Sequence, residues 1–291
     1  MSIKKIVTDS VLIDTVNSTK SDLQSIKESI IRQMIIEGVD DPGILKCVFM
    51  AGGAGSGKGF ISSELFGIDI TIKSTMAASG LKVVGSDGAF EALLKKNGID
   101  PKDLAKIEKE TPDLWDKISN NSDSIRNQAK AISTNQKSFY EAGRIGVIID
   151  GTGHNLGKIS KMKKHAEELG YDTSMVFVNT SLEIALLNNQ ARSRTLADDI
   201  VKKTWYAVQN NLGKFQSMFG GNFSIVDNTD KKPFEHAFKN KQKGGYDKVL
   251  KPVEQRIHKL VSKFVQDEVR NPIGKQWILT ARALKNKNLI K

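Results

Sequence analysis

The chain has 291 residues, of which 39% are hydrophobic and 26% are charged. This composition excludes a disordered chain, and no apolar run approaches the ~20 residues that a membrane-spanning helix needs. The single cysteine, Cys47, excludes an internal disulfide framework and a Cys-rich zinc site. Polar residues interrupt the apolar run near the N-terminus, unlike a secretory signal peptide. We therefore expect a cytoplasmic protein with no membrane contact.

Positive charge is concentrated at one end of the sequence. The chain has 44 Lys or Arg and 33 Asp or Glu, a formal net charge of +11. Residues 229–291 hold 16 of these basic and 6 of these acidic residues, whereas residues 1–228 hold 28 and 27. The excess therefore belongs to the last fifth of the chain.

The first predicted unit, residues 1–45, is a helical extension. Its helix covers residues 21–37, where Leu23, Ile26, Ile30 and Met34 recur at helical spacing. Glycines and a proline in residues 38–43 then break the helix before the first strand.

Residues 46–228 form the predicted core. Helices are expected at 60–66, 158–169 and 182–191, each after an apolar run, which indicates βαβ units. The runs are nearly unbroken, as expected of parallel strands covered on both faces. They are Cys47–Met50, Leu81–Val84, Ile145–Ile149, Met175–Val178 and Phe223–Val226. The predicted fold class is α/β, a three-layer sandwich around a central five-stranded parallel sheet.

Two further helical regions interrupt the regular alternation of the core. Residues 88–144 form a predicted helical insertion, with helices at 90–96, 101–109 and 124–142. Another helix is expected at 198–219, between the fourth and fifth strands. After the core, residues 229–291 form a basic extension with a helix at about 248–269.

A glycine-rich loop follows the first strand directly. Such a loop curls so that its N–H groups point at phosphate oxygens, and the next helix adds partial positive charge. Lys58 then reaches the outer phosphates of a nucleoside triphosphate. The alternative is a flexible turn, but the spacing and both flanks fit a phosphate loop. The candidate nucleotide-binding residues are Gly52, Gly53, Ala54, Gly55, Ser56, Gly57, Lys58, Gly59 and Phe60.

One position departs from the usual phosphate loop. The residue after the lysine is usually Ser or Thr, whose hydroxyl helps hold Mg²⁺, but here it is Gly59, followed by Phe60. Ser62 and Ser63 lie further along the helix and are not expected to substitute. The departure leaves phosphate binding in place and alters the expected metal geometry.

Two aspartates follow predicted strands, at the sheet edge where ligands bind in open α/β folds. Asp150 follows an apolar strand and is the candidate Mg²⁺ ligand; the alternative is an Asp-Gly turn. Asp87 is the candidate base that accepts a proton from an attacking hydroxyl; the alternative is an N-cap for the helix at 90–96. Thr152, just after Asp150, is a candidate acceptor contact, whereas His154 is interpreted as a polar loop residue.

Arginines near the fourth strand predict a lid. Arg192 and Arg194 follow the helix at 182–191, and a mobile arginine that closes over transferring phosphoryl oxygens stabilises their charge. The alternative is that they favour a helix C-terminus and solvent. Arg126, in the insertion, is a further candidate for gripping the phosphate of the acceptor.

The basic extension is a candidate DNA contact. Lysines that meet phosphates release counterions and bind nucleic acid without reading its sequence. Aromatic residues offer stacking surfaces there; the alternative is a solvated helical face with aromatics packed inward. These aromatic residues are Phe234, Phe238, Tyr246 and Trp277.

The order of these motifs resembles the zeta-toxin and polynucleotide-kinase-like group of P-loop kinases, including members that bacteriophages encode. The matching segments lie in residues 46–228 and include AGGAGSGKG, VVGSD, IIDGTGHN and NNQARSR. The resemblance implies a nucleoside-kinase-like sheet, ATP as donor and the host cytoplasm as location if a phage encodes the chain. It also implies that Asp87 is the acceptor-activating base, Lys58 a phosphate ligand, Arg192 or Arg194 the lid arginine and Asp150 near the metal.

Together these features predict a kinase that uses ATP or GTP with Mg²⁺. It would transfer the γ-phosphoryl group to a hydroxyl of a nucleotide or nucleic acid, such as a polynucleotide end or a hydroxymethylated base in DNA. Two alternatives remain open. One is a nucleotide-sugar kinase of zeta-toxin type, and the other is a non-catalytic nucleotide-binding protein that takes part in phage assembly or associates with DNA. Gly59 and Phe60 favour the second alternative.

Overall fold

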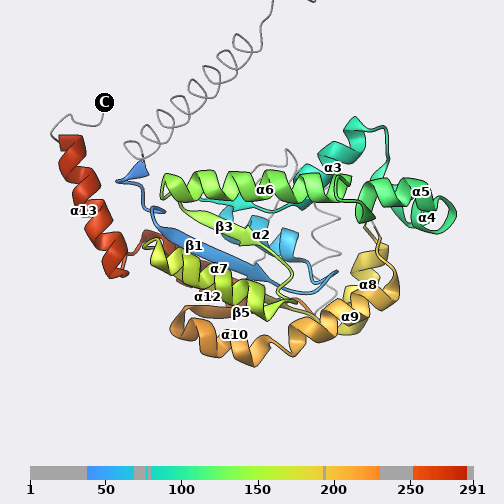
Figure 1. Cartoon of the computed structure of the whole chain (residues 1–291). Helices are drawn as coiled ribbons and strands as arrows, with labels where there is room; N and C mark the ends of the chain where they lie inside the picture. The colour runs from blue at the N-terminus through green and yellow to red at the C-terminus, as the bar shows by residue number, and fades with distance from the viewer. Residues whose placement is uncertain (1–37, 69–76, 78–79, 193–194, 230–251, 287–291) are drawn as a thin grey trace, which may run out of the picture.

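The computed structural model describes residues 38–68, 77, 80–192, 195–229 and 252–286. Its centre is one sheet of five parallel strands in the order β2-β3-β1-β4-β5 (Figure 1). The predicted fold class and all five strands are confirmed, with β4 beginning three residues earlier than expected. The strands are β1 Lys46–Ala51, β2 Lys82–Val84, β3 Val147–Asp150, β4 Asp172–Asn179 and β5 Phe223–Asp227.

Helices cover both faces of the sheet and make three layers. One face packs against α6 (Ile125–Ala142), α7 (Leu156–Glu168) and α10 (Leu212–Phe219) in a core that includes Phe49, Phe177 and Phe215. The other face packs against α2 (Lys58–Phe66) and α12 (Pro252–Gln266). Because both faces are covered, each strand has an apolar run, and polar residues lie mainly toward the strand ends.

The insertion between β2 and β3 has its own small core, built around Phe90, Leu94, Leu104 and Ile118. The predicted helix start at Pro101 is confirmed, but Pro112 starts a further helical stretch that the sequence did not predict. Its elements are α3 Asp87–Lys96, η2 Pro101–Asp103, α4 Leu104–Glu110, α5 Pro112–Trp115, η3 Asp116–Asn120 and then α6. Ser124 caps α6 as its hydroxyl accepts a hydrogen bond from the Asn127 N–H.

The helix predicted at 198–219 is two helices. These are α9 (Asp198–Gln209) and α10, which follow α8 (Leu182–Gln190); the short turn η4 (Gly220–Asn222) then leads to β5. The break falls at Asn211, whose side-chain amide donates to the carbonyls of Gly153 and His154.

The C-terminal residues contribute to the main core as well as to the surface. Ile257, Val261 and Val265 of α12 are buried against β1, β4, β5 and α2. A second helix, α13 (Pro272–Asn286), was not predicted, and its partly buried Trp277 packs against the main hydrophobic core. Among the described residues, no helix is long and apolar enough to cross a membrane.

Several predicted features lie outside the described residues. They are the N-terminal helix at 21–37, Arg194, and the aromatic residues Phe234, Phe238 and Tyr246. The division of the chain at residues 45 and 228 stays a prediction.

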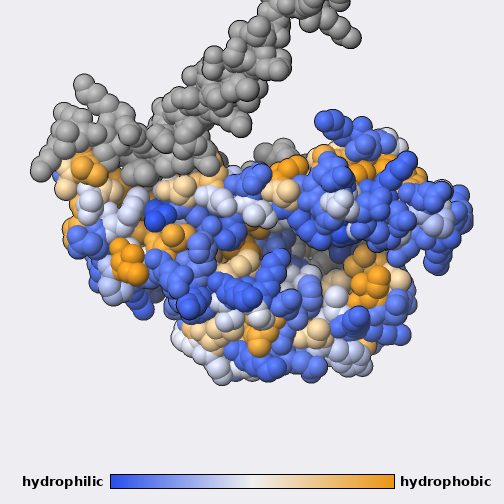
Figure 2. Space-filling view, in the orientation of Figure 1, coloured by the Kyte–Doolittle hydropathy of each residue, from blue (hydrophilic) through white to orange (hydrophobic). Residues whose placement is uncertain are grey.

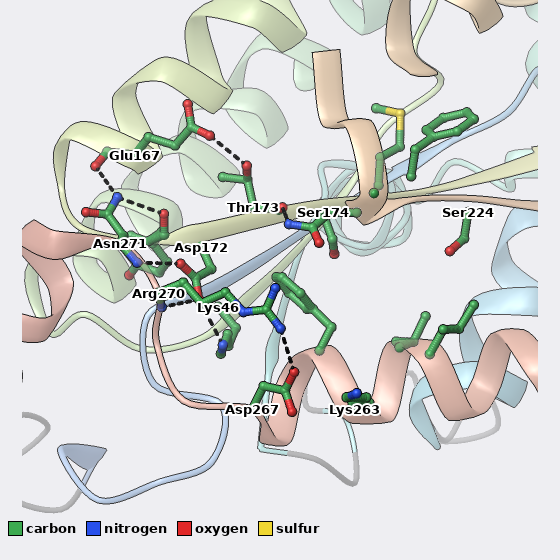
Figure 3. Close-up of a pocket in the computed structure, with 18 of the residues that line it drawn as sticks. Lys46, Glu167, Asp172, Thr173, Ser174, Ser224, Lys263, Asp267, Arg270 and Asn271 are labelled. Carbon is green, nitrogen blue, oxygen red and sulfur yellow. Dashed lines mark hydrogen bonds and ion pairs between the residues drawn. The ribbon is translucent and has the colours of Figure 1, made fainter. Parts of the chain in front are cut away.

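A buried ion pair joins the C-terminal segment to the sheet. Lys46 is 1% exposed, and its ammonium group lies 3.0 Å from the carboxylate of Asp172 and 5.1 Å from the ring centre of Phe264 in α12. The same carboxylate accepts the backbone N–H groups of Arg270 and Asn271, between α12 and α13 (Figure 3). One carboxylate therefore neutralises a buried lysine and holds the α12–α13 connection.

The Asp172→Asn substitution should destabilise the protein by about 3 kcal/mol, because it leaves the Lys46 ammonium buried without a counter-charge. Adding Lys46→Met to Asp172→Asn should recover most of that loss. The methionine removes the buried ammonium charge, and the side-chain oxygen of the new asparagine can still accept from the α12–α13 connection. Urea unfolding of the three proteins measures both effects. Equal stabilities of the single and double variants would contradict this account of the pair.

Candidate active site

The glycine-rich loop lies between β1 and α2, at the carboxyl edge of the sheet. Its carbonyl groups are bound from outside: Asn188 donates to the Gly55 oxygen at 2.8 Å, and Asn228 donates to the Ser56 oxygen at 2.9 Å. The Gly52 N–H donates to the Thr152 oxygen. These contacts hold the outer side of the loop and fix its curvature.

Close packing explains one glycine of the loop. Gly55 has a φ of +75°, and a Cβ there would lie 2.0 Å from the Ala185 carbonyl oxygen of α8. The neighbouring Ala54 is buried with Ala185 and Val201, so α8 and α9 support the loop from its outer side. A side chain at Gly55 would push the loop off this support.

The inner side of the loop matches a phosphate. No protein acceptor is found, among the described residues, for the N–H groups of Gly53, Ala54, Gly55 and Gly57. The Ser56 hydroxyl is buried and has no partner in the described structure. Lys58 donates to the carbonyls of Gly52 and Gly53, at 2.8 and 3.4 Å. Buried donors without acceptors are costly, and phosphate oxygens would satisfy them.

Four charged side chains interact across this edge. Burial lowers the pKa of Lys58, while Asp150 and Asp87 oppose that shift. Asp150 is solvent accessible yet enclosed by protein, and this reduced hydration raises its pKa; Lys58 and Arg192 act in the opposite direction. The fold thus brings Lys58, Asp150, Asp87 and Arg192 into one electrostatic group, as expected where charge is to be stabilised.

Asp87 is the first residue of α3, so the alternative interpretation of it as an N-cap is wrong. Ser86 occupies the N-cap position, without a side-chain capping hydrogen bond. Three residues further along α3, the Phe90 ring lies 4.5 Å from the Arg126 guanidinium carbon of α6. Arg126 therefore lies beside the first turns of α3, the helix that Asp87 begins.

The loop after β3 carries the other predicted residues. A Cβ on Gly85, at the end of β2, would lie 3.4 Å from the Asp150 Cβ, so a glycine there leaves room for the aspartate. Thr152 hydrogen-bonds to His154, and its backbone oxygen contacts the phosphate loop. The structure places Thr152 between the phosphate loop and solvent.

The predicted lid arginines follow α8. Arg192 is exposed and begins the connection to α9, and Arg194 lies outside the described residues. The Asn189 side chain donates to the Leu196 oxygen and accepts from the Leu196 N–H, which closes this connection into a loop. Figure 2 shows the surface hollowed between the insertion helices α3–α5 and the α8–α9 pair.

The predicted metal position has few protein ligands. Within the described ranges no cluster of three or more Asp, Glu, His or Cys is placed to hold a metal. Asp150 with phosphate oxygens and water fits Mg²⁺, which keeps several waters and uses one or two carboxylates. A Cβ on Gly59 would meet nothing within 4 Å, and the Ser63 hydroxyl donates to the Phe60 oxygen instead.

Two asparagines that support the site were not assigned a role from the sequence. Asn188 and Asn228 were visible only as parts of NNQARSR and an Asp-Asn pair after the last strand. Asn228 is 3% exposed, and its carbonyl accepts from the Thr180 hydroxyl. Asn188 lies near the end of α8 and Asn228 follows β5, and the loop carbonyls that they bind are distant in sequence.

No family model and no curated protein matches the chain. Solved structures resemble it in fold, at low identity. A shikimate kinase from Acinetobacter baumannii is 12% identical over 70% of this chain and 97% of its own, with a TM-score of 0.34. A protein of the PezAT chromosomal toxin–antitoxin system of Streptococcus pneumoniae is 13% identical over 92% and 100%, with a TM-score of 0.42. Deoxyadenosine kinase from M. mycoides is 17% identical over 68% and 99%, with a TM-score of 0.30.

The Asp150→Asn substitution should stabilise the protein at pH 7. Because the native pKa of Asp150 is raised, the native state loses stability as pH rises from the unfolded pKa through the native one, and asparagine removes that loss. The urea midpoint of the variant should exceed that of wild type at pH 7, with a smaller difference at pH 4. Asp113→Asn, in exposed α5, controls for removal of one surface charge. A variant less stable than wild type at pH 7 would contradict this assignment.

The Gly59→Ser substitution should lower the Mg²⁺ concentration needed for tight ATP binding several-fold. The position has room for the side chain, and the hydroxyl there is the usual loop ligand of the metal. Gly59→Ala is the matched control, since it adds the Cβ without the oxygen. Mg²⁺ titrations at fixed ATP measure the effect, and identical curves for the serine and alanine variants would refute it.

Proposed function

We propose that the chain is a kinase that transfers the γ-phosphoryl group of ATP or GTP to a hydroxyl of a nucleotide or nucleic acid. The observation that carries the proposal is the phosphate loop. On the outer side of the loop, two carbonyl oxygens accept hydrogen bonds from Asn188 and Asn228. On the inner side lie four N–H groups, the Ser56 hydroxyl and Lys58. This is a preorganised site for a polyphosphate beside two carboxylates.

In the proposed reaction, the loop N–H groups and Lys58 bind the donor phosphates. The acceptor hydroxyl oxygen attacks the γ-phosphorus in line, the bond to the β–γ bridging oxygen breaks, and ADP or GDP leaves. Asp87 takes the proton of the attacking hydroxyl, and Arg192 stabilises charge on the migrating group. Asp150 would hold Mg²⁺, which supplies charge neutralisation at the β- and γ-phosphates.

The acceptor side of the proposed site lies toward the insertion. Asp87 opens α3, and Arg126 projects from α6 onto the Phe90 ring. A guanidinium at the first turns of the helix that begins with the proposed base is suited to a phosphate already present on the acceptor, as in a nucleotide or a polynucleotide end. Thr152, in the loop after β3, is proposed as a second acceptor contact.

The test uses γ-labelled ATP with mononucleotides, nucleotide-sugars, single strands and hydroxymethylated duplex DNA as acceptors. Wild type should label one class of acceptor. Lys58→Met should lose about a hundredfold or more of the transfer rate because it removes a cation from the donor phosphates. Asp87→Asn should keep ATP affinity and lose about 10²–10⁴-fold in transfer, as for removal of a general base.

Lys202→Met, an exposed lysine of α9, is the control for Lys58→Met. Label on nucleotide-sugars alone would favour the zeta-toxin type of activity. If no acceptor is labelled and ATP still binds in a Lys58-dependent way, the chain is a non-catalytic nucleotide-binding protein, the alternative favoured by Gly59. Loss of ATP binding in Asp87→Asn would move Asp87 to the donor site.

A DNA contact by the C-terminal extension also remains a proposal. Its support is the exposed Lys259, Lys263 and Lys275 on α12 and α13. Because α12 is part of the sheet core, single lysine substitutions, and not truncation, are the means to examine it.

A further inference from the structure

The layer formed by α6, α7 and α10 is strongly basic, although residues 1–228 are nearly neutral overall. These three helices contain eight Lys or Arg and three Asp or Glu. They pack side by side on one face of the sheet, the face toward the viewer in Figure 1. Positive charge is therefore concentrated on this layer, although basic and acidic residues nearly balance over residues 1–228.

Each of the three acidic residues already has a partner on this layer. Glu141 pairs with Lys137 and lies 3.6 Å from His165, Glu167 pairs with Lys163, and Glu168 pairs with Lys164. Lys158, Lys161 and Lys214 are exposed and have no carboxylate partner among the described residues. The uncompensated charge of the layer therefore projects into solvent.

Lys158 and Lys161 lie along α7, a helix that begins at the candidate active site. α7 begins at Leu156, directly after the loop that carries Asp150 and Thr152, so Lys158 lies in its first turn. Lys161 follows about 4.5 Å further along the helix axis at 1.5 Å per residue, on the same side. The neighbouring helix α6 adds Lys130, which lies one turn after Arg126.

The opposite composition is found in the other part of the insertion. From Asp87 to Asn120 there are six Lys and eight Asp or Glu, so exposed lysines such as Lys102, Lys106 and Lys109 lie among carboxylates. A polyanion would be repelled from that region and attracted to the α6–α7–α10 layer. Over the described part of the surface, the charge distribution thus favours approach of a polyanion along the α6–α7–α10 layer.

We propose that the α6–α7–α10 layer binds the phosphate backbone of a nucleic acid whose hydroxyl is the acceptor. Binding of the backbone follows from the layer alone, whereas its role in presenting the acceptor rests on the proposed kinase function. The contacts are charge–charge contacts to phosphates, so they release counterions and carry no sequence preference.

The test compares wild type with the triple variant Lys158→Gln/Lys161→Gln/Lys214→Gln. Fluorescence anisotropy with a labelled single strand and with a duplex of equal length measures affinity from about 50 to 200 mM salt. The variant should bind about tenfold or more weakly at low salt, and its log–log salt slope should fall by about 2 to 3, as for three lost phosphate contacts. ATP affinity should be the same in both proteins.

The triple variant Lys102→Gln/Lys106→Gln/Lys109→Gln removes the same charge from the insertion and should bind nucleic acid like wild type. Thermal unfolding of each variant guards against loss of fold. Wild-type binding that is absent, or equal in both triple variants, overturns the proposal. If binding depends on the α7 and α10 lysines but no acceptor is phosphorylated, the proposed binding surface is supported and only the proposed kinase function is contradicted.

Discussion

Parallel hydrogen bonding of β1 to β3 on one side and to β4 on the other pairs Met50 with Asp150 and Ala51 with Phe177. Every proposed functional group depends on this register. Strands that run in the same direction end at the same edge, so the phosphate loop after β1, Asp150 at the end of β3 and Asp87 beyond β2 all emerge there. A shift of one residue would turn each strand's side chains to the opposite face.

The phosphate loop shows how the surrounding fold preorganises a site. Asn188 and Asn228 bind its carbonyls, and α8 and α9 pack against its outer side. These contacts stabilise a curvature that leaves inward N–H groups and the buried Ser56 hydroxyl without partners in the part of the chain that the structure describes. Burial by the same surroundings lowers the pKa of Lys58 and raises the pKa of Asp150. The site is thus held in a costly arrangement by the packing around it, as is typical of binding sites for charged ligands.

Charge serves two separate purposes in this protein. Part of the C-terminal basic excess is structural, because Arg282 and Lys285 both pair with Asp40, and Arg270 pairs with Asp267. Asp172 binds the same segment to the sheet through Lys46 and two backbone N–H groups. Three exposed lysines that have no carboxylate partner among the described residues, Lys158, Lys161 and Lys214, lie on α7 and α10, in the part of the sequence that is nearly neutral overall. Net charge by segment therefore does not locate the charged surface.

The sequence by itself determined the α/β class, the five strands and the phosphate loop, because apolar runs and glycine spacing are local patterns. It also placed Asp87 and Asp150 at strand ends, and therefore at one edge. It did not reveal α13 or the break between α9 and α10, where Asn211 donates to a loop almost sixty residues earlier. Only the tertiary structure decided that Asn188 and Asn228 hold the loop, that α12 completes the core and that lysines of α7 and α10 share one face. Each of these depends on contacts between residues far apart in the chain, which no local pattern records.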